Sequence, residues 1–126
     1  MVYYKHTTGG YRMEFYTKET LKEVENKTDA NSYYLPKALF ARKTNTVRLE
    51  TRLAYVAILD TLLKKPSFTK DGLAFIKMDN PEIGRTLATL ANKEVNQEKV
   101  NKYLEELSDA DLIEINKQDI NVSNVG

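Results

Sequence analysis

The sequence predicts an α+β fold, and two kinds of apolar spacing support this prediction. Apolar residues follow one helical face near the C-terminus, at Val100, Tyr103, Leu104 and Leu107. Two strand-like stretches, 112–115 and 120–122, follow that helix and are separated by the turn sequence NKQD. A longer helical pattern over 48–63 adds to this mixture of helices and strands.

The first forty residues predict a hairpin and two short helices. Residues 1–16 alternate on both sides of HTTGG, which is typical of a β-hairpin whose turn uses the positive φ of Gly9 and Gly10. A short, mostly polar helix is expected over 17–27, followed by the loop TDANS. In YYLPKALF, residues 33–40, Pro36 suits the first turn of a further helix.

The next segment contains the strongest helical pattern, over 48–63. Its leucines and valine are expected to form a stripe that faces the core: Leu49, Leu53, Val56, Leu59, Leu62 and Leu63. Pro66 ends this helix, KDG turns the chain, and a short strand is expected over 73–78. Asn80 as a cap and Pro81 at the first helical position start another helix, and residues 92–95 link it to the last one.

This order of elements is that of a winged helix-turn-helix with an added N-terminal β-hairpin. We expect residues 1–31 to form the hairpin and short helix, and residues 32–126 to form the winged-helix domain. The wing would be the hairpin of 112–115 and 120–122. In such a fold the last helix lays its first turns into the DNA major groove.

Composition argues against several other classes of protein. The chain has no cysteine, and its one histidine, His6, lies near a turn without clustered acids. Parts for a catalytic triad or a zinc site are therefore missing, so we expect neither an enzyme nor a cofactor. No apolar run approaches a membrane span and no signal peptide is recognisable, which favours a cytoplasmic protein.

Charge is unevenly distributed along the chain. Residues 35–70 carry eight basic and two acidic residues, a net +6 in a chain whose formal net charge is +1. Such a segment can face phosphates, although a solvated surface is the commoner explanation. Candidate phosphate ligands come from this segment, the linker and the wing: Lys37, Arg48, Arg52, Lys93 and Lys117.

The last helix offers candidate base-reading side chains on its polar face. Asn and Gln can pair with adenine, and Lys can pair with guanine or phosphate. The candidates lie at the helix opening and in its first turns: Asn96, Gln97, Lys99, Asn101 and Lys102. An ordinary solvated helix remains the alternative, because nearby phosphates would be repelled by the acidic residues Glu105, Glu106, Asp109 and Asp111.

Four stretches in order resemble one protein family: YYLPKALF (33–40), TRLAYVAILD (51–60), KDGLAFIKM (70–78) and VNKYLEELSDADLIEI (100–115). Together they resemble the N-terminal domain of the RepA-type plasmid replication initiators of Gram-positive bacteria. The aromatic-aromatic-x-Pro-Lys-x-Leu-Phe motif is the most specific part. Two features depart from the family: Asp111 stands where glycine usually ends the last helix, and the turn before Val100 is longer.

The resemblance implies binding of repeated sites (iterons) in double-stranded plasmid origin DNA, by a dimer. It also implies a C-terminal domain, resembling the primosomal DnaD type and absent from this chain, that engages host replication proteins. A transcriptional repressor and a winged helix used only for protein contacts remain alternatives. No membrane partner is expected.

The N-terminal hairpin is the predicted homodimer surface, because its large rings would otherwise be exposed. These candidates are Tyr3, Tyr4, Tyr11 and Phe15. The alternative is that the hairpin folds back over its own core.

Overall fold

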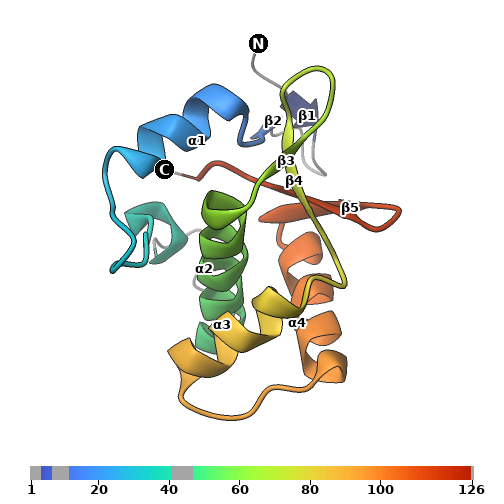
Figure 1. The fold of residues 1–126 in the computed structure, drawn as a ribbon. Helices are drawn as coiled ribbons and strands as arrows, with labels where there is room; N and C mark the ends of the chain where they lie inside the picture. Colours follow the sequence, from blue (N-terminus) through green and yellow to red (C-terminus); the bar gives the residue numbers. More distant parts are fainter. Residues whose placement is uncertain (1–3, 7–11, 41–46, 126) are drawn as a thin grey trace.

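The computed structural model describes residues 4–6, 12–40 and 47–125 of the chain (Figure 1). Its helices are α1 (Lys18–Glu25), the 3-10 helix η1 (Lys37–Phe40), α2 (Leu49–Lys64), α3 (Pro81–Ala91) and α4 (Gln97–Asp109). Its strands are β1 (Tyr4–His6), β2 (Arg12–Glu14), β3 (Ser67–Phe68), β4 (Ala74–Lys77), β5 (Ile113–Asn116) and β6 (Asp119–Val122). The predicted α+β class is confirmed.

The larger sheet has four antiparallel strands in the order β3-β4-β6-β5. In the β5–β6 hairpin, Ile113 pairs with Val122 and Asn116 pairs with Asp119, so Lys117 and Gln118 form the turn. Each of the two strands lies within one residue of its predicted start. The smaller sheet is the antiparallel pair β1–β2, which begins the chain as expected.

Residues Phe15–Thr17 join the N-terminal segment to the larger sheet. Phe15 bridges to Ser123 and Thr17 bridges to Leu73. Between them, the Tyr16 N–H donates to the Val122 carbonyl and the Tyr16 carbonyl accepts from the Ala74 N–H, both at 3.0 Å. The segment therefore lies between the start of β4 and the end of β6.

Helix α1 begins directly after this segment and shares the core of the other helices. Thr17 and Thr20 form a reciprocal capping box, each accepting a hydrogen bond from the other's backbone N–H. Leu21 and Val24, the two apolar anchors predicted for this helix, are buried in the same cluster as the residues of α2. Residues 15–25 are thus part of one core with the elements that follow them.

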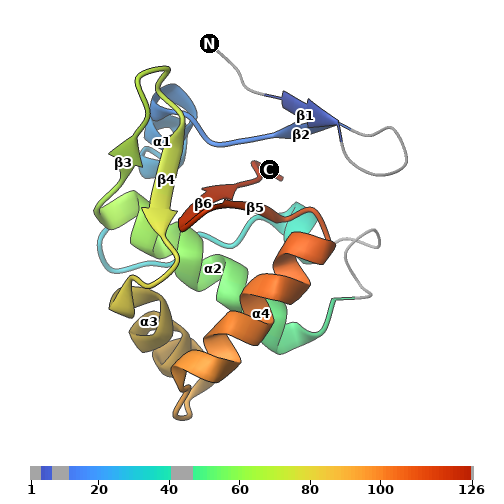
Figure 2. The ribbon, with the colours of Figure 1, turned by 90° about the vertical axis from the view of Figure 1, so that its right-hand side faces the viewer.

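Helix α2 is the central element, with α3 and α4 packed against it (Figures 1 and 2). The expected single stripe is wrong for this helix, because nearly every residue from Thr51 to Leu62 is buried. Leu49, in contrast, is the first residue of α2 and is 58% exposed. None of the described helices is long and apolar enough to cross a bilayer.

Other predictions are corrected in detail. The helix expected after Pro36 is a single 3-10 turn, η1. The two-residue strand β3 was not predicted, because a pair of residues is too short to establish a periodicity. Phe15 is 5% exposed and packs inside the fold, so it does not offer the protruding ring that the dimer prediction assumed. Tyr3, Tyr11 and the side chain of Tyr4 lie outside the described residues.

Candidate nucleic-acid interface

Helices α3 and α4 follow one another across a short turn, and capping residues fix their ends. The Asn80 side chain accepts from the Glu82 N–H at 2.9 Å, and Pro81 takes the first helical position, as predicted. Asn92 ends α3 in the left-handed conformation, with φ of 53°. Four residues later, the Asn96 side chain accepts from the Lys99 N–H at 2.9 Å and starts α4.

One face of helix α4 is buried, and the opposite face is exposed. Val100, Tyr103, Leu104 and Leu107 are each at most 3% exposed and pack in the core, as their spacing predicted. The opposite face consists of polar side chains in the first two turns. This arrangement leaves the opening of α4 accessible to a partner.

The structure brings the base-reading candidates together at this opening. Gln97, Lys99, Asn101 and Lys102 are exposed. The Gln97 side-chain amide donates to the Asn101 side-chain oxygen at 2.9 Å, so these two amides act as one hydrogen-bonded pair. Asn96 differs from the others, because its side-chain oxygen is used to cap the helix.

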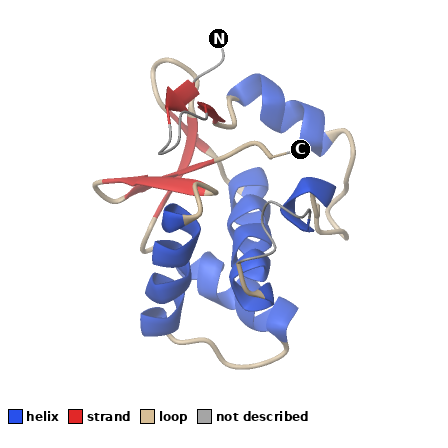
Figure 3. Cartoon of the chain, turned by 180° about the vertical axis from the view of Figure 1, so that it is seen from behind, coloured by secondary structure: helices blue, strands red, loops and turns tan. Residues whose placement is uncertain are grey.

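Among the phosphate candidates, Lys117 lies on the same side of the molecule as α4. It occupies the turn of the β5–β6 hairpin, is exposed, and has a φ of 60°. The hairpin turn and α4 lie along one side, at the right of Figure 1 and the left of Figure 3. Helix η1, which carries Lys37, lies on the other side of α2. The structure therefore separates Lys37 from Lys117 and α4, whereas Arg52 lies beside η1, with its guanidinium 5.7 Å from the Phe40 ring.

Arg48 and Lys93 are near α4, but both are paired with carboxylates of the protein. The Arg48 guanidinium binds Glu106 through two contacts of 2.6 and 2.9 Å, and the Thr51 hydroxyl donates to the same carboxylate at 2.7 Å. The Lys93 ammonium binds Glu50 at 2.6 Å. Arg52 is directed elsewhere: its Nε donates to the Val47 carbonyl at 2.8 Å.

These contacts form one network, which we call the polar clamp. Tyr103 joins its two halves, because its hydroxyl donates to Glu50 and its ring lies 5.2 Å from the Arg48 guanidinium. Its members are Arg48, Glu50, Thr51, Lys93, Tyr103 and Glu106. The sequence did not reveal this network, since its partners are more than 40 residues apart and follow no local period.

The polar clamp shifts the pKa values of its titratable groups. The Lys93 ammonium and then the Tyr103 hydroxyl lower the pKa of Glu50 from its usual 4.5 to about 2. The hydrogen bond from Arg48 lowers the pKa of Glu106 as well. Both carboxylates are therefore ionised at neutral pH, and each neutralises one of the predicted phosphate ligands.

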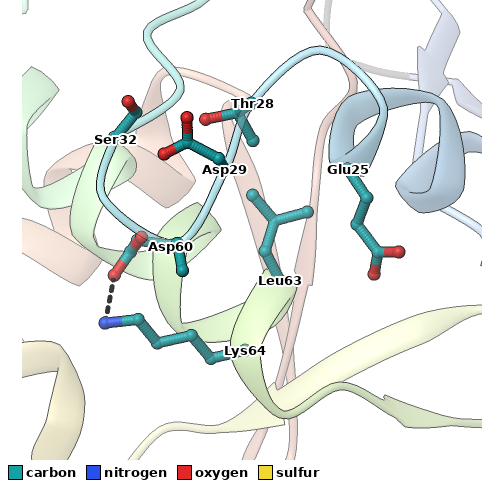
Figure 4. Close-up of a pocket in the computed structure, with 8 residues that line it drawn as sticks. Glu25, Thr28, Asp29, Ser32, Asp60, Leu63 and Lys64 are labelled. Carbon is teal, nitrogen blue, oxygen red and sulfur yellow. Dashed lines mark ion pairs between the residues drawn. The ribbon is translucent and has the colours of Figure 1, made fainter.

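A pocket of about 290 Å³ lies away from α4, between the loop after α1 and the end of α2 (Figure 4). Its lining carries three carboxylates, those of Glu25, Asp29 and Asp60, and one ammonium group, Lys64. Lys64 is bound to Asp60 at 3.0 Å, a contact that raises the pKa of Lys64. This acidic lining does not suit a nucleic acid. Within the described residues, no cluster of His, Cys, Asp or Glu could hold a metal ion.

Comparison with known proteins gives one structural similarity. No protein-family model and no curated protein sequence matches the chain. A solved structure described as "Structure of MDR initiator" superposes with a TM-score of 0.50 and 18% sequence identity, over 82% of this chain and 84% of that one. At this identity the similarity is one of fold, and it extends over most of both chains.

Proposed function

We propose that this chain is the DNA-binding domain of a plasmid replication initiator. It would be a winged helix-turn-helix in which α4 is the recognition helix and the β5–β6 hairpin is the wing. The observation that carries this proposal is the capped α3–α4 pair with the exposed polar opening of α4, on the same side as Lys117. The similarity in fold to an initiator supports it.

In this proposal, the chain binds repeated origin sites in double-stranded DNA to start replication. Gln97 and Asn101 would read bases as a pair, with Lys99 and Lys102 beside them. Lys117 would contact phosphate from the wing. Asn96 would act through its cap, which also directs free backbone amides of the first turn of α4 toward phosphate.

Two further parts of the proposal concern assembly. A homodimer suits repeated sites, because two copies can contact two half-sites at once. Since Phe15 is buried, a dimer surface on the N-terminal hairpin would depend on Tyr3, Tyr4 and Tyr11. Contact with host replication proteins would belong to a further domain.

A winged helix that binds proteins instead of DNA is the second candidate. The observation that favours it is that Arg48 and Lys93, two of the cations nearest α4, are already neutralised by Glu106 and Glu50. Exposed Glu105 and Asp109 extend the negative charge along α4. A transcriptional repressor would use the same DNA-binding surface as an initiator.

The deciding experiment is selection of duplexes from a random-sequence pool, followed by titration of an enriched duplex and its scrambled counterpart. We expect the enriched duplex to bind more tightly, with log affinity falling linearly as log salt rises. Lys117→Ala should weaken both duplexes alike and flatten that slope by about one unit. Lys37→Ala is the matched control, since η1 lies on the other side of α2, and should leave the slope unchanged.

Failure to enrich any sequence, together with no binding at low salt, would favour the protein-binding alternative. Equal affinity for enriched and scrambled duplexes would remove the claim of sequence recognition. A separate test distinguishes an initiator from a repressor and uses plasmid origin repeats as the probe. Binding of the chain to these repeats should be required for plasmid replication only if the chain belongs to an initiator.

A further inference from the structure

The polar clamp connects the three segments whose relative positions define the candidate reading surface. Arg48, Glu50 and Thr51 lie at the start of α2, Lys93 lies in the turn after α3, and Tyr103 and Glu106 lie in α4. Every contact in the network joins two of these segments, apart from the local one between Arg48 and Thr51. The network therefore spans the helix-turn-helix from its supporting helix to its last helix.

The polar clamp fixes the orientation of α4, which the apolar contact between α4 and the core does not define by itself. Helix α4 packs on the core through aliphatic side chains and the ring of Tyr103, and hydrophobic burial is not directional. The Arg48–Glu106 contact is bidentate, at 2.6 and 2.9 Å, and such a pair is defined in angle as well as distance. The Thr51 hydroxyl donates to Glu106 Oε1, the oxygen that also accepts from Arg48 Nε. The Tyr103 hydroxyl donates to the second oxygen of Glu50, whose first oxygen binds Lys93.

Charge balance argues that these groups position α4 and do not bind phosphate themselves. Two cations and two carboxylates make the network neutral. A phosphate that bound Arg48 or Lys93 would have to displace Glu106 or Glu50 from a contact of 2.6 Å and leave that carboxylate close to the DNA. Lys99, Lys102 and Lys117 are exposed and have no ion-pair partner in the described chain.

We propose that Glu106 and Glu50 are positioning residues, which set the orientation of α4 against α2 and so aim Gln97 and Asn101 at the bases. This inference rests on the proposed function for its consequence in DNA binding, but the orientation itself is a property of the free protein. Arg48 and Lys93 serve as the partners of these carboxylates, and the phosphate contacts belong to other lysines.

The test replaces Glu106 by Gln, which keeps the size of the side chain and removes its charge. Glu105→Gln is the matched control, because it makes the same change in charge on the same helix at an exposed position. Binding is measured to a duplex enriched from a random pool by the unaltered chain, and to its scrambled counterpart, at two salt concentrations. Residual dipolar couplings of backbone amides report the angle between α2 and α4 without DNA.

We expect Glu106→Gln to lower the preference for the enriched duplex about tenfold, with the salt slope unchanged, and to change the α2–α4 angle. Glu105→Gln should change neither the preference nor the angle. Tyr103→Phe, which keeps the ring in the core and removes the hydroxyl bound to Glu50, should act in the same direction as Glu106→Gln. If Glu106→Gln fails to fold, the same two measurements on Tyr103→Phe test the inference.

Tighter binding of both duplexes by Glu106→Gln, with a steeper salt slope, would overturn the inference, since Glu106 would then compete with phosphate for Arg48. An unchanged angle would also overturn it. If the unaltered chain enriches no duplex, the proposed function fails. The dipolar couplings then decide the positioning role alone, because they need no DNA.

Discussion

Asp111 is a single residue at which backbone conformation and residue type disagree. Its φ is 59°, and it ends α4 in a Schellman motif, in which the Leu112 N–H donates to Leu107 and the Asp111 N–H donates to Ser108. Glycine adopts this conformation without the steric cost that a β-carbon imposes. The chain therefore carries a small local cost at the point where α4 leads into β5.

Replacing Asp111 by Gly should stabilise the protein by about 0.5–1 kcal/mol, because the strain is relieved by more than the added flexibility of the unfolded chain costs. Asp109→Gly is the control: Asp109 is the last residue of α4, so glycine there should destabilise the helix. Urea denaturation measures both changes. A lower midpoint for Asp111→Gly would show that its carboxylate contributes more than the strain costs.

At the scale of elements, α4 combines a core stripe with a paired polar face. The Gln97–Asn101 hydrogen bond joins residues one turn apart, so each amide is held in place by the other. Their arrangement gives the proposed reading surface an acceptor and donors in fixed relation, as bidentate pairing with a base requires.

Gln97→Ala and Asn101→Ala should each weaken binding of the enriched duplex by about 1–3 kcal/mol, while the double variant should lose less than the sum of the two. The reason is that each single change also releases its partner amide. Fluorescence titration of all four proteins gives the interaction energy. Additive losses would mean that the two side chains act independently, and unchanged affinity in all variants would mean that α4 is not the reading helix.

Sequence patterns identified those elements whose signals are local. The stripe of α4, the Asn80–Pro81 start of α3 and the β5–β6 hairpin could all be predicted, since spacing, capping and turn chemistry lie within a few residues. The polar clamp could not, because it depends on how α2 and α4 cross. For the same reason the sequence predicts Arg48 and Lys93 as phosphate ligands but does not indicate their carboxylate partners, which lie 58 and 43 residues away in the sequence.

At the scale of the molecule, the N-terminal segment and the remaining elements share one core. Tyr16, Leu21 and Val24 are each at most 5% exposed and belong to the same buried cluster as α2, α3 and α4. The backbone of Phe15–Thr17 also satisfies hydrogen bonds of β4 and β6. A boundary at residue 31 therefore separates parts that depend on each other for burial.

A chain that begins at residue 32 should fail to fold cooperatively, because it exposes the surface that α1 and residues 15–17 cover. A chain that begins at residue 12 keeps these contacts and is the matched control, which should melt in one sharp transition. Circular dichroism during heating distinguishes the two results. A cooperative melt of the shorter chain would establish residues 32–126 as an independent domain.

Lowering the pH should reduce the free energy of unfolding of the whole molecule through the polar clamp. The direction of this change follows from the pKa of Glu50. Its pKa in the folded protein is about 2 against 4.5 without its partners, and the pKa of Glu106 is lowered in the same direction. The unfolded chain therefore takes up protons first as pH falls, so the stabilising contribution is complete above pH 4.5 and is lost progressively toward pH 2.

Glu50→Gln removes the titrating group and should flatten this part of the curve of unfolding free energy against pH. Glu105→Gln, which changes an exposed carboxylate, should leave its slope close to that of the unaltered chain. Urea unfolding between pH 2 and pH 7 tests both, and a curve for Glu50→Gln as steep as the original would mean that Glu50 does not hold Lys93 and Tyr103 in solution.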